Sequence, residues 1–285
     1  MIHEIPLERR TLHGHFSREL DPILTIDPGD SIAFACPNAG WDLASGERFE
    51  PYDPELDAGH ALIGPVEVRG AGEGGTLAVT IEEVRPATWG VTWGHELRVE
   101  WTLSGGVGRE EQGRLVELAP FLGVLGMPPA EPGRHPTGPP RRCGGNIDCK
   151  ELVAGTTLFL PIPVDGALFS AGDGHAAQGD GELSGTAIEC PVERAVLRLE
   201  LRADLELRAP IARIDGAWLA FGFDADLDLA AEQAAATVLD LMERELAIDR
   251  NYALALASVA VDLRVTQIVN GVKGVHAVLR DDAIR

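Results

Sequence analysis

Apolar and polar residues alternate with a period of two along most of the chain, a pattern typical of β-strands that bury one face. Within residues 23–35 two such runs flank Asp27-Pro28-Gly29-Asp30, and this turn chemistry predicts a hairpin. The alternation predicts further strands at residues 63–70, 76–84, 97–103, 158–164, 183–189, 192–207 and 216–223. Residues 37–59 and 123–142 carry few periodic apolar positions, so we expect them to be irregular.

The period changes towards the C-terminus. Residues 228–246 place apolar side chains near helical spacing, and Asp228 is a suitable N-cap. A second helix is predicted from Asp249 or Arg250 to about Leu263, with Asp249 as its cap. Because strands and helices do not alternate, the pattern favours neither a Rossmann sheet nor a TIM barrel. It predicts a mainly β fold: a β-sandwich or jelly-roll-like body with two C-terminal helices.

Composition narrows the domain organisation and the class of partner. With 285 residues and 45% hydrophobic content, we expect a single domain over residues 1–285, divisible into a β-rich lobe (1–122) and a site-bearing lobe with the helices (123–285). The formal charge of −21 and the lack of a basic run argue against nucleic-acid binding. No apolar run is long enough to span a membrane, and the first residues lack a signal-like apolar core, so we expect a cytoplasmic protein.

Residues 168–189, LFSAGDGHAAQGDGELSGTAIE, hold the densest cluster of chemically useful side chains. Asp173, His175, Asp180 and Glu182 offer the oxygen and nitrogen ligands that bind Zn²⁺, Mn²⁺ or Ca²⁺. The Asp-Gly-His spacing places Asp173 and His175 on one side of an extended chain. Asp and Gly are also common in solvated turns, so the residues alone leave a metal site and a surface turn open.

A second candidate is the segment Cys143-Gly144-Gly145-Asn146-Ile147-Asp148-Cys149. Its paired glycines can expose backbone N–H groups to an oxyanion, while Asn146 and Asp148 supply an amide and a carboxylate. A Gly-Gly turn followed by an Asx cap is the alternative interpretation. In a chain of this size the cysteines are expected to be reduced, and the spacing of this pair is not that of a zinc knuckle.

Several single residues are expected to have structural roles. His60 stands alone before a predicted strand, where a histidine is more often packed or at the surface than a ligand. Trp89, Trp93 and Trp101 lie in or near one strand region, and core packing explains them. Most of the polar residues near the C-terminus are expected at the surface or at a helix end: Asp262, Arg264, Gln267, Asn270, Lys273 and His276.

The string GDGHAAQGDGE at residues 172–182, followed by GTAIE, resembles the central signature of the acetamidase/formamidase family, and CGGNID precedes it at the expected distance. Residues 22–30, 59–71, 221–228 and 262–277 also resemble family segments in the same order, so the likeness covers nearly the full length. One departure concerns the first motif. Many members carry His-Gly-Gly-Asn where this chain has Cys143-Gly144-Gly145-Asn146, so the role of that histidine passes to a thiol here or is lost.

The resemblance implies a mostly β, metal-assisted, homo-oligomeric hydrolase that converts small linear amides such as formamide or acetamide to the carboxylate and ammonia. On this basis Asp148, Asp173 and His175, together with His60, are expected to hold a divalent metal that lowers the pKa of its bound water. Zn²⁺ is the first choice for a mixed histidine and carboxylate site, and Ca²⁺ is the second. The expected partner is the small amide substrate.

The remaining steps of amide hydrolysis need a proton carrier and a stabilised oxyanion. Glu182 or Asp180 is expected to carry the proton to the leaving nitrogen. Asn146 and the N–H groups of Gly144 and Gly145 are expected to face the oxyanion.

Two alternatives remain open from the residues. Cys143 or Cys149 could attack the amide carbonyl to form a thioester, with His175 as the base. In the other alternative the chain is a non-catalytic β-sandwich that binds a metal or small ligand, because a fold does not prove a function.

Overall fold

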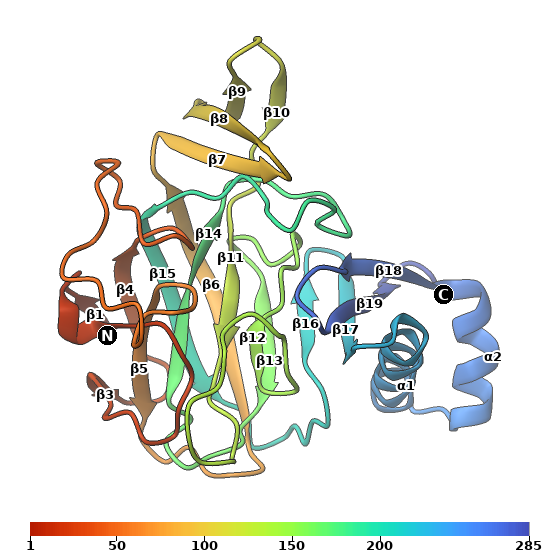
Figure 1. Ribbon diagram of the computed structural model, residues 1–285. Coiled ribbons are helices and arrows are strands. Elements are labelled where there is room, and N and C mark those ends of the chain that lie inside the picture. The colour runs from red at the N-terminus through yellow and green to blue at the C-terminus, as the bar shows by residue number, and fades with distance from the viewer. Residues whose placement is uncertain (285) are drawn as a thin grey trace.

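The computed structural model describes residues 1–284, which form a strand-rich body with two helices at one side (Figure 1). The largest sheet has nine strands in the order β1 (Ile2–Ile5), β4 (Ser31–Cys36), β15 (Val192–Leu201), β6 (Thr76–Pro86), β13 (Thr157–Pro161), β16 (Ile211–Ile214), β17 (Ala217–Asp224), β19 (Lys273–Arg280) and β18 (Val261–Gln267). The pairing of β1 with β4 is parallel, and the other pairings in this sheet are antiparallel.

A second sheet packs against the first. Its strands are β12 (Gly144–Asn146), β11 (Phe121–Gly126), β14 (Phe169–His175), β5 (Leu62–Val68) and β2 (Leu12–His13), with β3 (Leu24–Ile26) parallel to β5. Buried side chains of both sheets share one apolar cluster, for example Ile81 and Leu197 of the first sheet with Ile63 and Phe169 of the second. Burial of the facing apolar sides drives the two sheets together. The expected mainly β, sandwich-like body is therefore confirmed.

A third, smaller sheet projects from one end of the sandwich (Figure 1). It consists of β10 (Leu115–Glu117), β9 (Val107–Glu110), β8 (Leu97–Ser104) and β7 (Trp89–Gly94), all antiparallel. The backbone of Val91 on β7 exchanges two hydrogen bonds with Glu189, at N···O distances of 2.9 and 2.8 Å. This sheet therefore touches the segment that follows β14.

The two predicted helices are present. Helix α1 (Leu227–Leu246) buries Ala230, Ala234 and Val238 in a cluster shared with β17 and β19, and α2 (Arg250–Ala260) follows it. The cap of α2 is Asp249, as expected, but the cap of α1 is Asp226 rather than Asp228. Neither helix combines the length and apolar character of a membrane span among the residues that the structure describes. A short 3-10 turn, η1 (Arg9–Thr11), precedes β2.

Four strand and loop expectations are wrong in detail. The turn at 27–30 forms, since Asp30 N–H donates to Asp27 O at 3.1 Å, but β3 and β4 then enter different sheets and make no hairpin. Local turn chemistry sets the reversal of the chain, whereas the choice of partner strand is a tertiary matter. Residues 183–189 are turns and bends, the strand expected at 192–207 ends at Leu201, and β11 occupies the start of the segment expected to be irregular.

The largest correction concerns residues 261–280. The second helix ends at Ala260 rather than near Leu263, and β18 and β19 follow it as an antiparallel pair. Gln267 and His276 are fully buried, with 0% exposed surface, instead of lying at the surface. Their strands therefore bring polar side chains inward.

Gly222 on β17 provides a test of how α1 docks. A Cβ at this position would lie 2.1 Å from Ala230 O and 2.4 Å from Ala234 N, both of which are helix backbone atoms. Because neither atom can swing aside, Gly222→Ala is expected to lower the free energy of unfolding by about 1–3 kcal/mol. Chemical denaturation checks this. Gly72→Ala is the control, because a Cβ at this position meets nothing within 4 Å. Equal stability of the two variants would contradict the close packing of α1 on Gly222.

Candidate active site

The glycine-rich strand β14 carries the first two site residues. Asp173 and His175 extend from one face of it, as their spacing predicts, while Gly172 and Gly174 face neighbouring backbone. A Cβ on Gly172 would lie 2.2 Å from Ala61 O, and one on Gly174 would lie 2.6 Å from Cys190 O. The glycines therefore let other segments approach closely, and they leave the opposite face to the polar side chains.

His175 lies at the centre of a buried group of carboxylates. Its Nε2 atom is 3.4 Å from Asp173 Oδ2 and 3.3 Å from Glu189 Oε1, and its Nδ1 atom is 3.9 Å from Asp148 Oδ1. Each of these four residues has less than 4% of its surface exposed. Glu182, which is 6% exposed, completes the group, since it and Asp148 lie with His175 within metal-ligand range of one another.

Hydrogen bonds set the orientation of the His175 ring. Gln178 Nε2 donates to the backbone carbonyl oxygen of Asp148 at 2.7 Å, so Gln178 Oε1 is left to accept. His175 Nδ1 lies 3.0 Å from Gln178 Oε1 and must therefore be the donor in this hydrogen bond. The lone pair of a neutral His175 is then on Nε2, the atom that faces Asp173 and Glu189.

Asp148 enters the group from the turn after β12. Asn270 Nδ2 donates to Asp148 Oδ2 at 2.7 Å, while no residue in the described range 1–284 donates to Oδ1. Gly123 on β11 makes room for this carboxylate. A Cβ at Gly123 would lie 2.6 Å from Asp148 Oδ1 and 2.5 Å from Asp173 Oδ2.

Three of the carboxylate residues adopt left-handed backbone conformations. The φ angles of Asp148, Asp173 and Glu182 are 52°, 64° and 47°. Such conformations are costly for residues other than glycine, and they persist where the surrounding structure holds them, often at functional sites.

Burial and crowding shift the pKa values of the group. Burial raises the pKa of Asp148 well above its usual value, and the Glu182 carboxylate adds to this effect. Burial likewise raises the pKa of Glu182 to about 7. The pKa of Asp173 falls, because His175 and His60 outweigh the effect of burial, and the pKa of His175 rises, because Glu189 and Asp173 outweigh its burial. Without a further cation, the group retains protons near neutral pH.

The unpaired oxygen atoms indicate what the group can hold. Asp148 Oδ1, Asp173 Oδ1, Glu182 Oε2 and Glu189 Oε2 are all buried without a hydrogen-bond partner among residues 1–284. Unpaired buried carboxylate oxygens are costly unless a cation satisfies them. Two groups of three residues bring ligand atoms within 4.8 Å of one another: Asp173, His175 and Glu189 form one, and Asp148, His175 and Glu182 form the other. Carboxylate oxygens with an imidazole nitrogen suit a divalent cation. These residues therefore fit the metal that the sequence implies.

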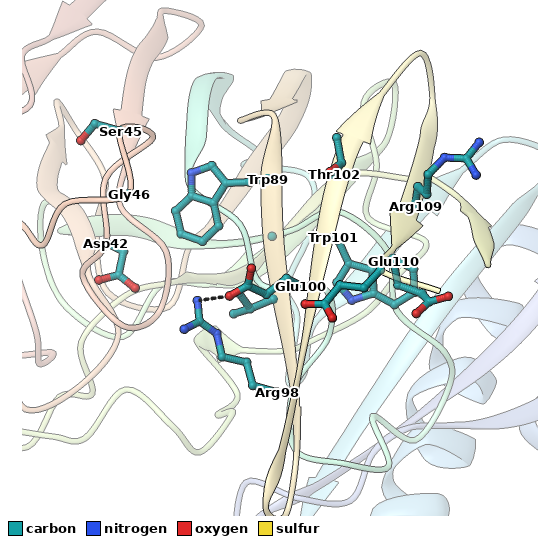
Figure 2. A pocket seen from close by; sticks show the side chains of 13 residues that line it. Asp42, Ser45, Gly46, Trp89, Arg98, Glu100, Trp101, Thr102, Arg109 and Glu110 are labelled. Atoms are coloured by element: carbon teal, nitrogen blue, oxygen red, sulfur yellow. Dashed lines mark ion pairs between the residues drawn. The ribbon is translucent and has the colours of Figure 1, made fainter. Parts of the chain in front are cut away.

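The group opens towards a hollow of about 740 Å³ at the protein surface. Gln178 and Glu182 belong to its lining, together with apolar residues such as Ala187 and Ile188. A second hollow lies over β7 and β8, where Trp89 and Trp101 point into it near the ion pair of Arg98 and Glu100 (Figure 2). These tryptophans are thus only partly buried, contrary to the expected core role, and that hollow shares no lining residue with the carboxylate group.

The structure places some of the other predicted residues near this group. His60 Nε2 lies 4.0 Å from Asp173 Oδ2, so His60 stands at the edge of the group. Asp180 instead pairs with Lys150 at 2.9 Å at the rim of the hollow. Gly144 N–H donates to Arg141 O at 3.0 Å within a turn, so the predicted role of Gly144 as an oxyanion donor is not supported.

The cysteine motif is buried on the strand next to β11. The Cys143 thiol is 6% exposed and lies 3.3 Å from Met127 O, to which it donates. Burial raises the pKa of Cys143 to about 11. Asn146 is buried too, and its Oδ1 has no partner in the described part of the chain. Gly145 lies in β12, between Cys143 and Asn146 in the sequence.

Sequence reasoning missed three residues of the site: Gly123, Glu189 and Asn270. Glu189 was expected in a strand and Asn270 at the surface, and no spacing links either of them to His175. The backbone bridge to Val91 places Glu189 beside His175, and the loop after β18 places Asn270 beside Asp148. Gly123 was read as loop, although its alternation within LGVLG is a weak strand signal.

Comparisons with known proteins agree with this picture. A formamidase from Methylophilus methylotrophus is 23% identical over 242 residues, which are 61% of this chain and 60% of that relative. The crystal structure of an acetamidase from Bacillus halodurans superposes with a TM-score of 0.85 at 27% identity and covers 97% of both chains. An acetamidase structure from Yersinia enterocolitica gives a TM-score of 0.87 at 22% identity, covering 100% of this chain and 94% of that one, and shows the shared fold.

The sequence profile of the Acetamidase/Formamidase family matches residues 3–117 and 126–215, which together make up most of the chain. The profile match includes the β14 signature, and the superposition on the Bacillus halodurans acetamidase covers 97% of this chain. The chain therefore belongs to the acetamidase/formamidase family, a family of hydrolases that act on linear amides.

Proposed function

We propose that this protein hydrolyses small linear aliphatic amides to a carboxylate and ammonia at the group around His175, with a divalent cation bound there. The observation that carries this proposal is the set of four buried, unpaired carboxylate oxygens that surround one oriented imidazole beside a surface hollow. The family membership, the formamidase and acetamidase relatives and the family's likeness at the β14 motif support the same chemistry.

Asp173, His175 through Nε2, and Glu189 are the residues proposed to hold the cation, with Asp148 on the opposite side of the ring and His60 at the edge. A bound divalent cation polarises a carbonyl group and lowers the pKa of water at neutral pH. A nitrogen donor among carboxylates makes Zn²⁺ the first choice and Ca²⁺ the second. Gln178 keeps the imidazole in the tautomer that such binding needs.

Glu182 is the proposed proton carrier. Its carboxyl group has a pKa of about 7 in the cation-free group, and it lines the hollow through which a substrate reaches the group. Asp148, whose pKa is also raised, is a neighbouring carboxyl group within 4.8 Å. Asp180 is less suited, because Lys150 pairs with its carboxylate at 2.9 Å. Asn146 and the N–H of Gly145 remain the proposed donors to the oxyanion.

The cysteine mechanism has little physical support. A nucleophilic thiol needs a lowered pKa and access to the substrate. Burial raises the pKa of both Cys143 and Cys149, and both thiols are buried.

A homo-oligomer and a cytoplasmic location are also proposed. Helix α2 exposes large apolar side chains, Tyr252, Leu254 and Val259, which a second copy of the chain would cover. The four cysteines are free in the structure, as expected in a reducing compartment.

Replacing a proposed cation ligand should separate metal loss from misfolding. Asp173→Asn and Glu189→Gln are expected to weaken metal affinity by at least about 100-fold. Replacing a residue that only hydrogen-bonds to a metal ligand already lowers the affinity by about 10–100-fold. Elemental analysis by mass spectrometry, together with ammonia release from formamide, acetamide and propionamide, checks this. Asp180→Asn is the matched control and should keep metal and activity. Folded ligand variants with full metal content and full turnover would contradict the proposed ligand set.

Glu182→Gln should have a different effect. The amide cannot carry a proton but fills the same space, so kcat is expected to fall by about 10²–10⁴-fold while the bound metal stays. Steady-state ammonia release and metal content are the two readouts. Leu183→Ala, at the exposed neighbouring position, is the control. A kcat within a few-fold of the parent protein would exclude Glu182 as the proton carrier.

Cys143→Ser tests the thiol alternative. Since the thiol is a packed hydrogen-bond donor, the variant is expected to keep ammonia release within a few-fold and to bind metal as the parent protein does. Loss of turnover in a folded Cys143→Ser protein, together with inhibition of the parent protein by thiol alkylation, would favour the thioester mechanism instead.

A further inference from the structure

Cys149, Glu151 and His276 form a second cluster of ligand-type side chains, and it shares no member with the group around His175. The Cys149 Sγ atom, a Glu151 carboxylate oxygen and a His276 ring nitrogen all lie within 4.8 Å of one another. Cys149 and Glu151 come from the turn after β12, and His276 comes from β19. The proposed hydrolysis uses none of these three residues.

His276 is the member that points to a ligand. The residue is completely buried, with 0% of its surface exposed. Its Nδ1 atom lies 2.8 Å from Thr266 Oγ1 across the β18–β19 pair, whereas its Nε2 atom has no hydrogen-bond partner within residues 1–284. An unpaired buried nitrogen costs free energy. A histidine that binds a metal usually donates its other ring N–H to a hydrogen-bond acceptor, and the Thr266 hydroxyl oxygen can accept in this way.

Glu151 is oriented towards the same point. Arg264 Nη1 lies 3.2 Å from Glu151 Oε1 and fixes the carboxylate. The other oxygen, Oε2, accepts a hydrogen bond from the Cys149 thiol at 3.3 Å and lies 3.8 Å from His276 Nε2. The nearby Lys150 pairs with Asp180 rather than with this oxygen. A cation bound here would replace the proton of the Cys149 thiol as the partner of this oxygen.

Charge and ligand chemistry suit a thiophilic divalent metal. A cation that binds here would displace the proton of the Cys149 thiol into solvent. The resulting thiolate and the carboxylate each contribute one negative charge and a neutral imidazole contributes none, so a divalent cation gives a neutral buried site. Sulfur, nitrogen and oxygen donors at one point are typical of Zn²⁺, whereas Ca²⁺ and Mg²⁺ prefer oxygen alone.

We propose that Cys149, Glu151 and His276 bind a second divalent metal of the zinc class, separate from the cation at His175. Because Cys149 directly follows Asp148, this metal would tie the turn that carries Asp148 to β19. Glu151 also lines the 740 Å³ hollow, so solvent can supply a fourth ligand. The site has no zinc-knuckle spacing, because β19 supplies its histidine from far along the chain.

Cobalt substitution tests the proposal on the full-length protein. The metal-free protein is titrated with Co²⁺, and absorption is followed in the near ultraviolet, where thiolate-to-cobalt charge transfer appears. None of the proposed ligands at His175 is a thiol, so cobalt bound by Cys149 is the expected source of this band. The expected result is a band that saturates and that Zn²⁺ abolishes by displacement. No band at saturating Co²⁺ would overturn the proposal.

Variants assign the band to these residues. Cys149→Ser and His276→Gln should lose it, whereas Cys143→Ser and Cys190→Ala, which change other buried cysteines, should keep it. Circular dichroism and thermal unfolding confirm that each variant folds. If Cys149→Ser does not fold, His276→Gln and Glu151→Gln decide the question. A band that persists in folded His276→Gln and Glu151→Gln proteins would overturn the site. Because the readout is spectroscopic, the result does not depend on amide turnover.

Discussion

Gathering carboxylates away from water is unfavourable, and the structure around His175 depends on how this negative charge is balanced. Asp148, Asp173, Glu182 and Glu189 surround a single imidazole, and each keeps one buried oxygen without a partner. The charge of one histidine cannot balance four carboxylates, so protons or a cation must do so. The raised pKa values of Asp148 and Glu182 describe the protonated alternative. In the proposed function a divalent cation would replace these protons.

The fold supplies this group from separate parts of the chain. Strand β14 contributes Asp173 and His175, the turn after β12 contributes Asp148, and the bridge to β7 positions Glu189. Close approach of these segments requires glycine at Gly172 and Gly174, where neighbouring carbonyl oxygens occupy the place of a side chain. Gly123 has another task, because the space in front of it holds the carboxylates of Asp148 and Asp173. Each glycine thus serves a particular contact rather than general flexibility.

The sequence predicted the strand-rich body, both helices and the pairing of Asp173 with His175, because these follow from local periodicity. It could not predict that β3 and β4 separate into two sheets, because a turn motif carries no information on distant partners. The sequence does not indicate the places of Glu189, Asn270 and His276 for the same reason: each joins its cluster only through a contact with a segment far away in sequence. Asp180 illustrates the opposite error. It lies two residues before Glu182, so the sequence predicts that both carboxylates enter the site, but Lys150 pairs with Asp180 at the rim of the hollow.

Anomalous X-ray diffraction from zinc-loaded crystals, recorded on both sides of the zinc absorption edge, measures the location of the cation most directly. A strong anomalous peak between His175 Nε2 and the carboxylates of Asp173 and Glu189 is the predicted result. A protein that releases ammonia from amides in solution, yet shows no peak at this position in crystals soaked with zinc, would contradict a cation-dependent site at His175.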